Sequence, residues 1–582
     1  NAQTGTIAIG RNALTALTTG PGNIAIGYQA LFTETTGTGN TVIGYTAGKL
    51  LAGASYNTVI GREAMLVADG TESSNVAIGQ SSMGGANNNS VDGNVAVGRN
   101  SMVGGTGALI NNIAIGYFTM DGTGTIAGQD NIFMGANAGG GTWTTAASNY
   151  NIGIGTGAMD AAMNGALGNT AIGQNALSNL TEGDYNVAMG YTAGQNISTG
   201  THNVYIGYGA GLATTTATGN VAIGQDAYAA GTNSSVVAIG ASAGKTTTLN
   251  DGVWIGVNAN KLGTGGGGGT IIGHYAGYHA QGSQMVHVGQ NAGRYASGSL
   301  NVFVGLSAGQ GGTTSAPYSS GTDNVAIGAY ALDAFTTGYY NSAVGASAGS
   351  AITTGIYNTL LGRAAGASIT TGNYITAIGG STLNYLTVAT DSTVIGYDAG
   401  EYATGSYNTF VGSKAGQGGT TSAPYSSGEY NVALGYEALK GFTTGHSNVA
   451  VGVIAGDSIT TGQQNTLMGR YAGQSLTTDS YNTLIGSAAG QGLSSGDGYN
   501  TAIGYGALYY GGANASNVAI GPLAMYGTSG TKNAIRNVAI GQSAFQALDT
   551  GDYNVGIGYK AGENNNGTKN VFLGYQAANT ST

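Results

Sequence analysis

The chain has 582 residues, of which 110 are glycine and 4 are proline; only 7% are charged, and the net charge is −10. The 15 lysines and arginines are scattered, so they form no basic patch of the kind that nucleic-acid binding needs, and the lack of cysteine excludes disulfides and thiolate metal sites. No apolar run approaches the roughly 18 residues that a membrane span requires. We therefore expect neither a nucleic-acid partner nor membrane insertion.

A five-residue unit recurs from one end of the chain to the other. It consists of Asn, a β-branched residue, a middle residue, an aliphatic residue and Gly, as in residues 23–27 and 57–61. From Gly10 to Gly574 there are 33 copies over 564 residues, so the mean period is about 17.6 residues, and 17 is the commonest value. A small residue, usually Ala, stands three residues after each glycine. Hydrophobic residues placed this regularly favour an ordered chain over a disordered one.

Each unit has the pattern of a short β-strand. The residue directly before the glycine is aliphatic or Met in all 33 copies, and the residue three places before the glycine is β-branched in 32 of them, which is the period-two alternation of a strand. Identical strands at nearly constant spacing stack most naturally in parallel and in register, one coil per repeat. We predict an all-β fold, a parallel β-solenoid (β-roll) of about 33 coils, forming a single continuous domain over residues 1–582. At about 4.8 Å per coil, it would measure about 150 Å.

Two positions of the unit are predicted to hold the coils together. The glycine supplies a backbone corner that a Cβ would obstruct. The Asn side chains can form an amide ladder along the axis, each bonded to the next coil. This structural ladder is predicted at Asn23, Asn40, Asn57, Asn186, Asn203, Asn482 and Asn537, with glycine corners at Gly27, Gly44, Gly61, Gly190, Gly207, Gly486 and Gly541.

The middle position of the strand is also largely apolar, for example at Val42, Trp254 and Phe303. A strand that is apolar on both faces is usually buried on both faces. We therefore expect one face to line the core and the other to meet a second copy of the chain, with a homotrimer favoured over a monomer. Because the chain enters and leaves its coils without atypical caps, we expect either that it is a fragment or that its open ends stack head to tail into a polymer.

One long segment is duplicated. Residues 307–324 reappear at 414–431, 107 residues later, and the similarity extends over six coils, residues 301–400 and 408–507. Both copies lengthen one period to 23 residues, which predicts a protruding loop at the same phase of the coil. Such loops are either binding sites or spacers.

Several segments imitate chemical motifs. The pattern G-x-S-x-G at 240–244, 305–309 and 345–349 is a product of the repeat, and the glycine-rich stretch 263–269 lacks the Lys and Ser/Thr of a phosphate loop. His274 and His279 could share a metal only if the chain folded back between them. We predict no enzymatic activity, no cofactor and no metal site.

Many of the 36 tyrosines follow the strand glycine, as at Tyr28 and Tyr45, or precede the Asn, as at Tyr56 and Tyr357. Coil stacking would align them into partial columns. Such columns could pack between chains or bind glycans through their rings, and a spacing locked to the repeat favours packing.

The Asn-x-Ala-Ile-Gly-x-x-Ala unit resembles the head repeats of bacterial trimeric autotransporter adhesins. Residues 500–508 (NTAIGYGAL) are similar to the repeats of phage tail-fibre proteins. The resemblance covers essentially the whole chain and implies a left-handed β-roll, usually trimeric, on a cell or virion surface. The period of 17 is longer than in the adhesin heads, and no coiled-coil stalk, anchor barrel or self-cleaving C-terminal domain is evident.

Together these features predict an extracellular structural fibre or filament protein, either a shaft like those of tail fibres and adhesins or a head-to-tail filament subunit. The alternative is an adhesin that binds a surface glycan or receptor through its tyrosine columns and its two long loops.

Overall fold

The computed structural model describes residues 4–68, 72–86, 90–247, 250–264, 267–494, 496, 498–510, 515–527 and 534–578. These residues form strands and turns and contain no helix. The chain divides into two compact units, residues 1–285 and 286–582, and each is described by itself. The predicted parallel β-solenoid is confirmed in both.

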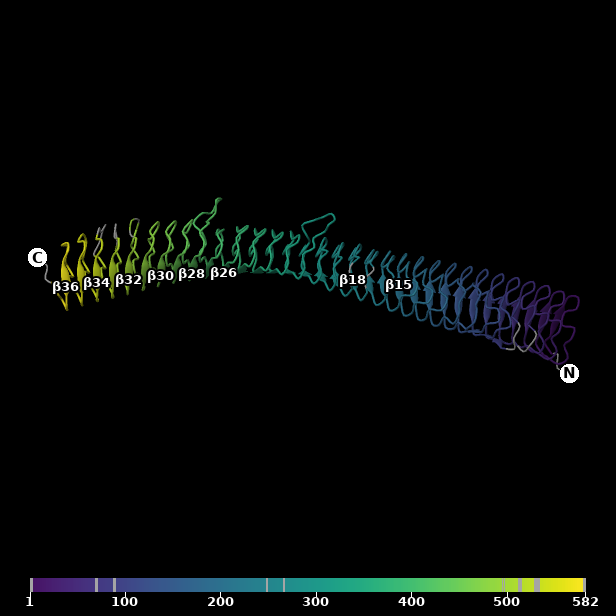
Figure 1. Ribbon diagram of the computed structural model, residues 1–582. Coiled ribbons are helices and arrows are strands. Elements are labelled where there is room, and N and C mark those ends of the chain that lie inside the picture. The colour runs from purple at the N-terminus through teal and green to yellow at the C-terminus, as the bar shows by residue number, and fades with distance from the viewer. Residues whose placement is uncertain are drawn as a thin grey trace. The chain divides into compact units, whose positions relative to one another are not determined.

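In the first unit each coil contributes one three-residue strand to a parallel ladder that contains β15 and β18 (Figure 1). Pairing is in register, so that Ala8 pairs with Ala25 and Ala25 with Val42. Among the described residues, the strands of this ladder are β1 (Ile7–Ile9), β2 (Ile24–Ile26), β3 (Thr41–Ile43), β4 (Thr58–Ile60), β5 (Val76–Ile78), β7 (Val95–Val97), β9 (Ile113–Ile115), β11 (Ile132–Met134), β12 (Ile152–Ile154), β13 (Thr170–Ile172), β14 (Val187–Met189), β15 (Val204–Ile206), β16 (Val221–Ile223), β17 (Val237–Ile239), β18 (Val253–Ile255) and β19 (Thr270–Ile272).

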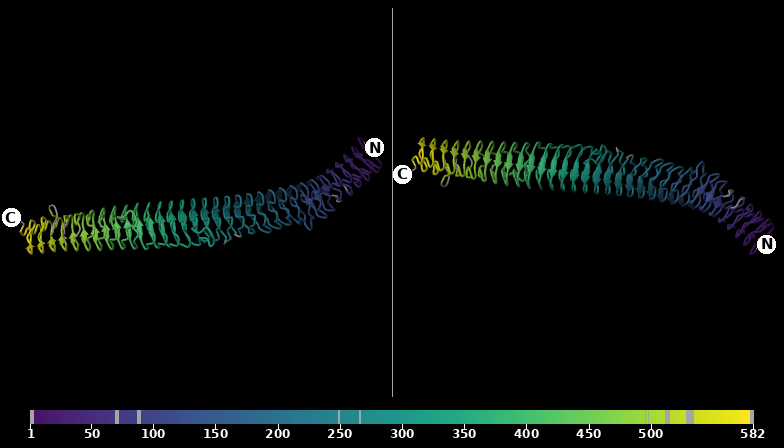
Figure 2. Two further views of the ribbon diagram at one scale, coloured as in Figure 1. Left: turned by 90° about the horizontal axis from the view of Figure 1, so that it is seen from above. Right: turned by 90° about the horizontal axis from the view of Figure 1, so that it is seen from below.

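The second unit repeats this arrangement, and Figure 2 shows the coils of each unit stacked one on the next. Phe303 pairs with Ala326, and Ala326 with Ala343. In the described part of this unit the strands are β20 (Val286–Val288), β21 (Val302–Val304), β22 (Val325–Ile327), β23 (Ser342–Val344), β24 (Thr359–Leu361), β25 (Thr376–Ile378), β26 (Thr393–Ile395), β27 (Thr409–Val411), β28 (Val432–Leu434), β29 (Val449–Val451), β30 (Thr466–Met468), β31 (Thr483–Ile485), β32 (Thr501–Ile503), β33 (Val518–Ile520), β34 (Val538–Ile540), β35 (Val555–Ile557) and β36 (Val571–Leu573).

A second, shorter parallel ladder lies in the first unit. It joins β6 (Val91–Asp92), β8 (Leu109–Ile110) and β10 (Gly128–Gln129), which come just before the main strands of their coils. Here the coil has hydrogen-bonded strands on two of its sides. Elsewhere the second side is held by single bridges, such as Asn149 with Leu167.

The strands place their middle residue in the core. Val42, Trp254 and Phe303 are fully buried, whereas their β-branched and aliphatic neighbours in the strand are partly exposed. The sequence left open which apolar face lines the core, and the structure assigns that role to the middle position. The outer face therefore carries Val, Ile, Thr, Met and Leu side chains in contact with solvent.

The glycine that closes each strand turns the chain sharply. Gly27 and Gly44 have φ values of 137° and 147°, which side chains other than glycine rarely adopt. A Cβ on Gly27 would overlap the carbonyl of Gly44, and one on Gly44 would overlap that of Gly61. Close stacking of the corners therefore requires glycine in consecutive coils.

Two loops project from the wall of the second unit, at the coils that follow β21 and β27 (Figure 1). They comprise residues 311–321 and 418–428, and their tips, 314–317 and 421–424, are exposed. Equivalent bridges, Ala296 with Ser319 and Ala403 with Ser426, tie both loops back to the wall. The two 23-residue periods therefore place identical sequences at equivalent positions, six strands apart.

Candidate functional site

The Asn residues of successive five-residue repeats form a hydrogen-bonded amide column inside the solenoid. The main-chain N–H and Nδ2 of Asn40 both donate to Oδ1 of Asn23, each over 3.0 Å. Asn57 donates to Asn40 in the same way, at 3.0 and 3.1 Å. The remaining Nδ2 proton of Asn40 is donated to the carbonyl of Ala54 at 2.7 Å. Each amide thus satisfies its own polar atoms and ties three coil segments together.

The other predicted ladder residues occupy the same environment. Asn186 donates to Asn169, Asn203 to Asn186, Asn482 to Asn465 and Asn537 to Asn517, with every distance between 2.8 and 3.2 Å. All of these amides are at most 1% exposed. At such burial a lost partner costs about 1–3 kcal/mol, because water cannot replace it. The column therefore stabilises the stacking of neighbouring coils in each of the two units.

The predicted corner glycines are likewise brought together along each unit. A Cβ on Gly190 would lie 2.6 Å from the carbonyl oxygen of Gly207, and one on Gly207 would lie 2.6 Å from that of Gly224. At Gly486 and Gly541 the corresponding distances to the next corner are both 2.5 Å. These separations are too short for any side chain.

The column is interrupted after Asn220. The next four coils carry Val236, Gly252, Gly269 and Met285 at the Asn position. The Val236 N–H still donates to Asn220 Oδ1 at 2.9 Å, but Val236 offers no amide to continue the column. Trp254, which is fully buried, fills the space beside Gly252, where a Cβ would overlap its ring. In these coils aromatic packing replaces the amide brace.

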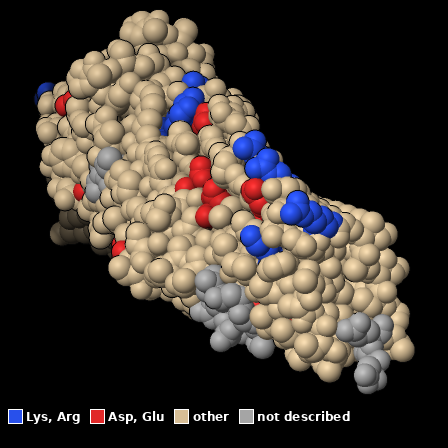
Figure 3. Space-filling model, turned by 90° about the vertical axis from the view of Figure 1, so that its right-hand side faces the viewer, with Lys and Arg blue, Asp and Glu red and all other residues tan. Residues whose placement is uncertain are grey.

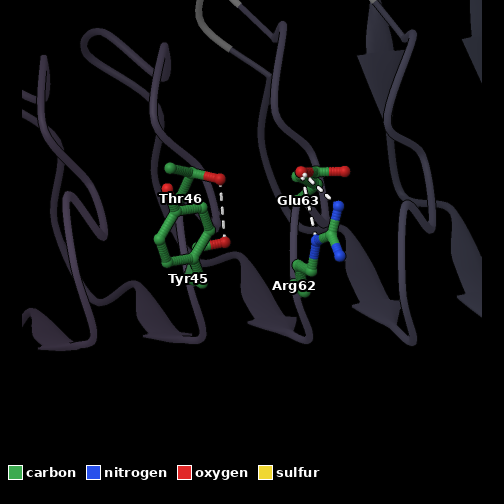
Figure 4. A network of polar contacts seen from close by, with 4 residues as sticks. All are labelled: Tyr45, Thr46, Arg62 and Glu63. Atoms are coloured by element: carbon green, nitrogen blue, oxygen red, sulfur yellow. Dashed lines mark hydrogen bonds and ion pairs between the residues drawn. The ribbon is translucent and has the colours of Figure 1, made fainter.

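Residues just after the corner carry much of the surface charge. Arg62 and Glu63 form an ion pair of 3.1 Å, and one coil earlier the Thr46 hydroxyl donates to the carbonyl of Tyr45 at 2.8 Å (Figure 4). In the view of Figure 3 most charged side chains lie in one band, and the rest of the visible surface is largely uncharged. Exposed ion pairs of this kind contribute at most about 1 kcal/mol each.

Exposed tyrosines stack along the axis at the corner before the Asn. The ring centroids of Tyr340 and Tyr357 are 4.9 Å apart at 27°, and those of Tyr357 and Tyr374 are 5.4 Å apart at 7°. Tyr407 stacks on Tyr430 at 4.9 Å and 4°. Because the faces of neighbouring rings cover each other, such a stack presents ring edges and hydroxyls to solvent. This geometry favours packing over the glycan stacking considered from the sequence.

One buried carboxylate was missed by sequence reasoning. Glu34 Oε1 accepts the N–H groups of Gly37 at 2.6 Å and Gly53 at 2.7 Å, and Oε2 accepts that of Ala54 at 3.1 Å. The side chain is fully buried and bridges two coils. Its position in the repeat could have indicated that it is buried. Glu34 lies seven residues after the corner glycine, where other coils carry a buried Leu or Ile such as Leu51 and Ile197.

A buried histidine is the second residue that sequence reasoning missed. His287 occupies the middle position of β20 and stacks on Phe303, with ring centroids 5.0 Å apart at 15°. Neither ring nitrogen has a hydrogen-bond partner among the described residues. Burial lowers the pKa of His287 from 6.5 to about 3, so the ring is neutral at physiological pH.

The imitated motifs take ordinary places in the repeat. Ser242, Ser307 and Ser347 each lie two residues after a corner glycine, in the left-handed turn conformation that recurs there, with φ between 53° and 56°. Within the described ranges no three His, Cys, Asp or Glu side chains gather in a way that could hold a metal ion. The described part of the chain likewise has no helix long and apolar enough to cross a membrane.

No protein-family model matches the chain, and no curated protein sequence is significantly similar to it. The resemblance to adhesin heads and tail fibres thus stays a prediction, and the candidate site is defined by its geometry alone: a buried amide column inside a stack of glycine corners.

Proposed function

We propose that the protein is an extracellular structural fibre, acting as a shaft or filament subunit on a cell or virion surface. The observation that carries the proposal is the amide column. It adds side-chain hydrogen bonds along the axis to those of the strand ladder, so that separating two coils breaks both sets together. Hydrogen bonds that run along the axis resist a load applied along it, as a fibre requires.

The outer face supports self-association. Met189, Leu361 and Met468 are 39%, 47% and 43% exposed, and they stand at the outward position that ends their strands. Large apolar side chains exposed on the outer face of each unit favour a protein partner. A second copy has the same coil spacing and could match such rows over many coils. The proposed assembly is a homotrimer or a head-to-tail polymer.

An adhesin is the second candidate function, and the two projecting loops are the observation that favours it. They are the prominent departures from the wall of the second unit, and their tips are exposed. Exposed loops on a rigid scaffold are common sites of recognition. The stacked tyrosines favour this alternative less, because their ring faces are occupied.

Electron microscopy of the purified full chain, combined with a mass measurement in solution, tests the fibre. Rods of about 150 Å with three times the chain mass support a trimeric shaft, and filaments of unlimited length support end-to-end stacking. Compact particles of single mass would refute the proposal. Met189→Glu and Met468→Glu together should weaken assembly without altering the core, whereas Ser242→Glu and Ser347→Glu together, both placed on turns, serve as the charge-matched control.

A further inference from the structure

The two projecting loops are held in the same way. In the first loop the hydroxyls of Thr313 and Ser319 are 3.0 Å apart, and in the second those of Thr420 and Ser426 are 3.1 Å apart. The N–H of Gly418 donates to the carbonyl of Lys440 at 3.0 Å. Gly311 makes the equivalent bond to Asp333 at 3.1 Å. With identical sequence and equivalent bonds, the loops themselves give no reason for a difference in binding.

The walls beneath the loops do differ. Four successive coils at the second loop present Glu401, Gln417, Lys440 and Asp457 at the position five residues after the corner glycine, and the corresponding residues at the first loop are Arg294, Gln310, Asp333 and Ser350. Charge is thus reversed at two of the four positions, and a carboxylate is replaced by a hydroxyl at a third. The duplication has therefore placed the same loop sequence over two walls that differ in charge.

At the second loop, wall and loop border an open cavity of about 440 Å³, lined by Tyr402, Gln417, Gly418, Thr421, Lys440 and Asp457 among others. This volume lies within the range of small-molecule sites, about 300–1,000 Å³. Tyr402 belongs to a cluster of three tyrosine rings: its centroid is 5.1 Å from that of Tyr385 and 6.2 Å from that of Tyr425, and the latter two are 5.0 Å apart. The aromatic wall is therefore rigid before any ligand arrives.

The polar groups of the cavity retain unused hydrogen-bonding capacity. Lys440 Nζ contacts Glu437 at 3.0 Å, which uses one of its three N–H groups. Gln417 donates to Glu401 at 3.0 Å, leaving its carbonyl oxygen available. Asp457 accepts one long bond from Ser458, at 3.4 Å. Among the described residues the Thr421 hydroxyl has no recorded partner. The cavity thus offers both donors and acceptors to a ligand.

These features select the chemistry of the ligand. An apolar molecule would strip water from several polar groups without replacing their bonds. An anion would meet more carboxylates than lysines, since Asp398, Glu401, Glu437 and Asp457 surround Lys414 and Lys440. A neutral ligand with many hydroxyls can both donate to Asp457 and Gln417 and accept from Lys440. Its apolar edge can rest against Tyr402.

We propose that the cavity under the second loop is a binding site for a neutral or amino sugar, and that the first loop does not form an equivalent site. The proposal deepens the adhesin alternative by assigning recognition to one loop base instead of to the tyrosine columns. It does not depend on the fibre, because the cavity lies within the second unit and uses no outward-facing strand residue.

The test is a glycan array probed with the labelled full chain and carrying neutral, amino and acidic oligosaccharides. We expect neutral or amino sugars to bind and acidic sugars to be rejected. Asp457→Ser should lower the signal at least about tenfold, because a hydrogen bond to a charged group is lost. Serine occupies the equivalent position, Ser350, in the first loop's wall, so the substitution is compatible with the coil.

Matched variants in the two loops sharpen the test. Thr421→Ala should weaken binding severalfold, whereas Thr314→Ala, the same change in the identical first loop, should leave it unchanged. Unaltered thermal unfolding of both variants would show that the fold is intact. Binding that is absent from the array, that survives Asp457→Ser, or that responds equally to Thr314→Ala would overturn the proposal. None of these results bears on the fibre proposal, which electron microscopy tests separately.

Discussion

Two stretches of the first unit stack their coils by different means. From Asn75 to Asn220 every coil contributes an amide to the column, whereas the coils of β17, β18 and β19 carry Val236, Gly252 and Gly269 at that position. The strand ladder nevertheless continues in register through the second stretch, with Ala238 paired to Trp254. Strand pairing therefore maintains the register without the column. The column adds stability where it is present, and aromatic packing substitutes where it is absent.

The largest expected effect comes from copying the second stretch into the first. Asn203→Val removes Nδ2 bonds of 2.9 Å to Asn186 and 2.8 Å to Ala217, and leaves the Asn220 N–H without its 3.0 Å acceptor. We expect the free energy of unfolding to fall by about 4 kcal/mol, since several buried polar groups lose partners. Denaturant titration of the full chain measures it. Val236→Ala is the control, and an equal loss in both variants would contradict a special role for the column.

The second-largest expected effect is a loss of stability at acid pH, which arises in a coil that lacks the amide. His287 lies two residues after Met285, and its pKa of about 3 in the folded chain is below the ordinary 6.5. Between these values the unfolded chain binds a proton that the folded chain does not, so stability falls as the pH is lowered from about 6.5. At pH 4 the loss should be about 3 kcal/mol.

His287→Phe isolates this contribution, because phenylalanine already fills the same strand position at Phe303 and Phe410. The variant should unfold with a weaker pH dependence between pH 6.5 and 4 than the parent chain. Identical pH profiles of the two proteins would show that folding does not lower the pKa of His287.

A coupled pair tests whether aromatic packing and the amide exclude each other. Gly252→Asn alone should destabilise the chain, because the new side chain would overlap the ring of Trp254. Together with Trp254→Ala, the Asn has room, so the double variant should be more stable than the sum of the two single losses by about 2 kcal/mol. If the stability loss of the double variant equals the sum of the two single losses, aromatic packing and the amide act independently.

The smallest effect is a gain. Ser392 stands at the Asn position of its coil and accepts the Asn408 N–H through its hydroxyl at 3.2 Å. Ser392→Asn should bring an amide oxygen within reach of both the N–H and Nδ2 of Asn408, raising stability by about 1 kcal/mol. The matched change Ser392→Ala should instead lower it, and thermal unfolding distinguishes the two directions.

Much of the fold could be predicted because the same local pattern was observed many times. The Asn-to-Gly unit indicated strand, corner and stacking, and the fold is a parallel solenoid. The core face was not predictable, because the middle residue Ala25 and its neighbours Ile24 and Ile26 are all apolar. The roles of Glu34 and His287 were also hidden. Each occurs once in a column of different residues, so periodicity carries no information about it.

The sugar site illustrates the same limit in another form. Repetition drew attention to the loops, where both copies are identical, but the proposed specificity lies in Lys440 and Asp457, where the copies differ. A search for periodic features passes over such residues. Only the coordinates show that they line one cavity.

The stacked glycine corners have a consequence for how such a chain can change in length. Because each coil packs only on the coils next to it, insertion or deletion of one whole repeat restores the local contacts and alters the stack by a single step of about 4.8 Å. A deletion of one residue inside a strand would instead turn the outward side chains beyond it toward the interior. The fold can therefore lengthen by the addition of whole repeats. The duplicated six-coil segment is what an earlier addition of this kind would leave in the sequence.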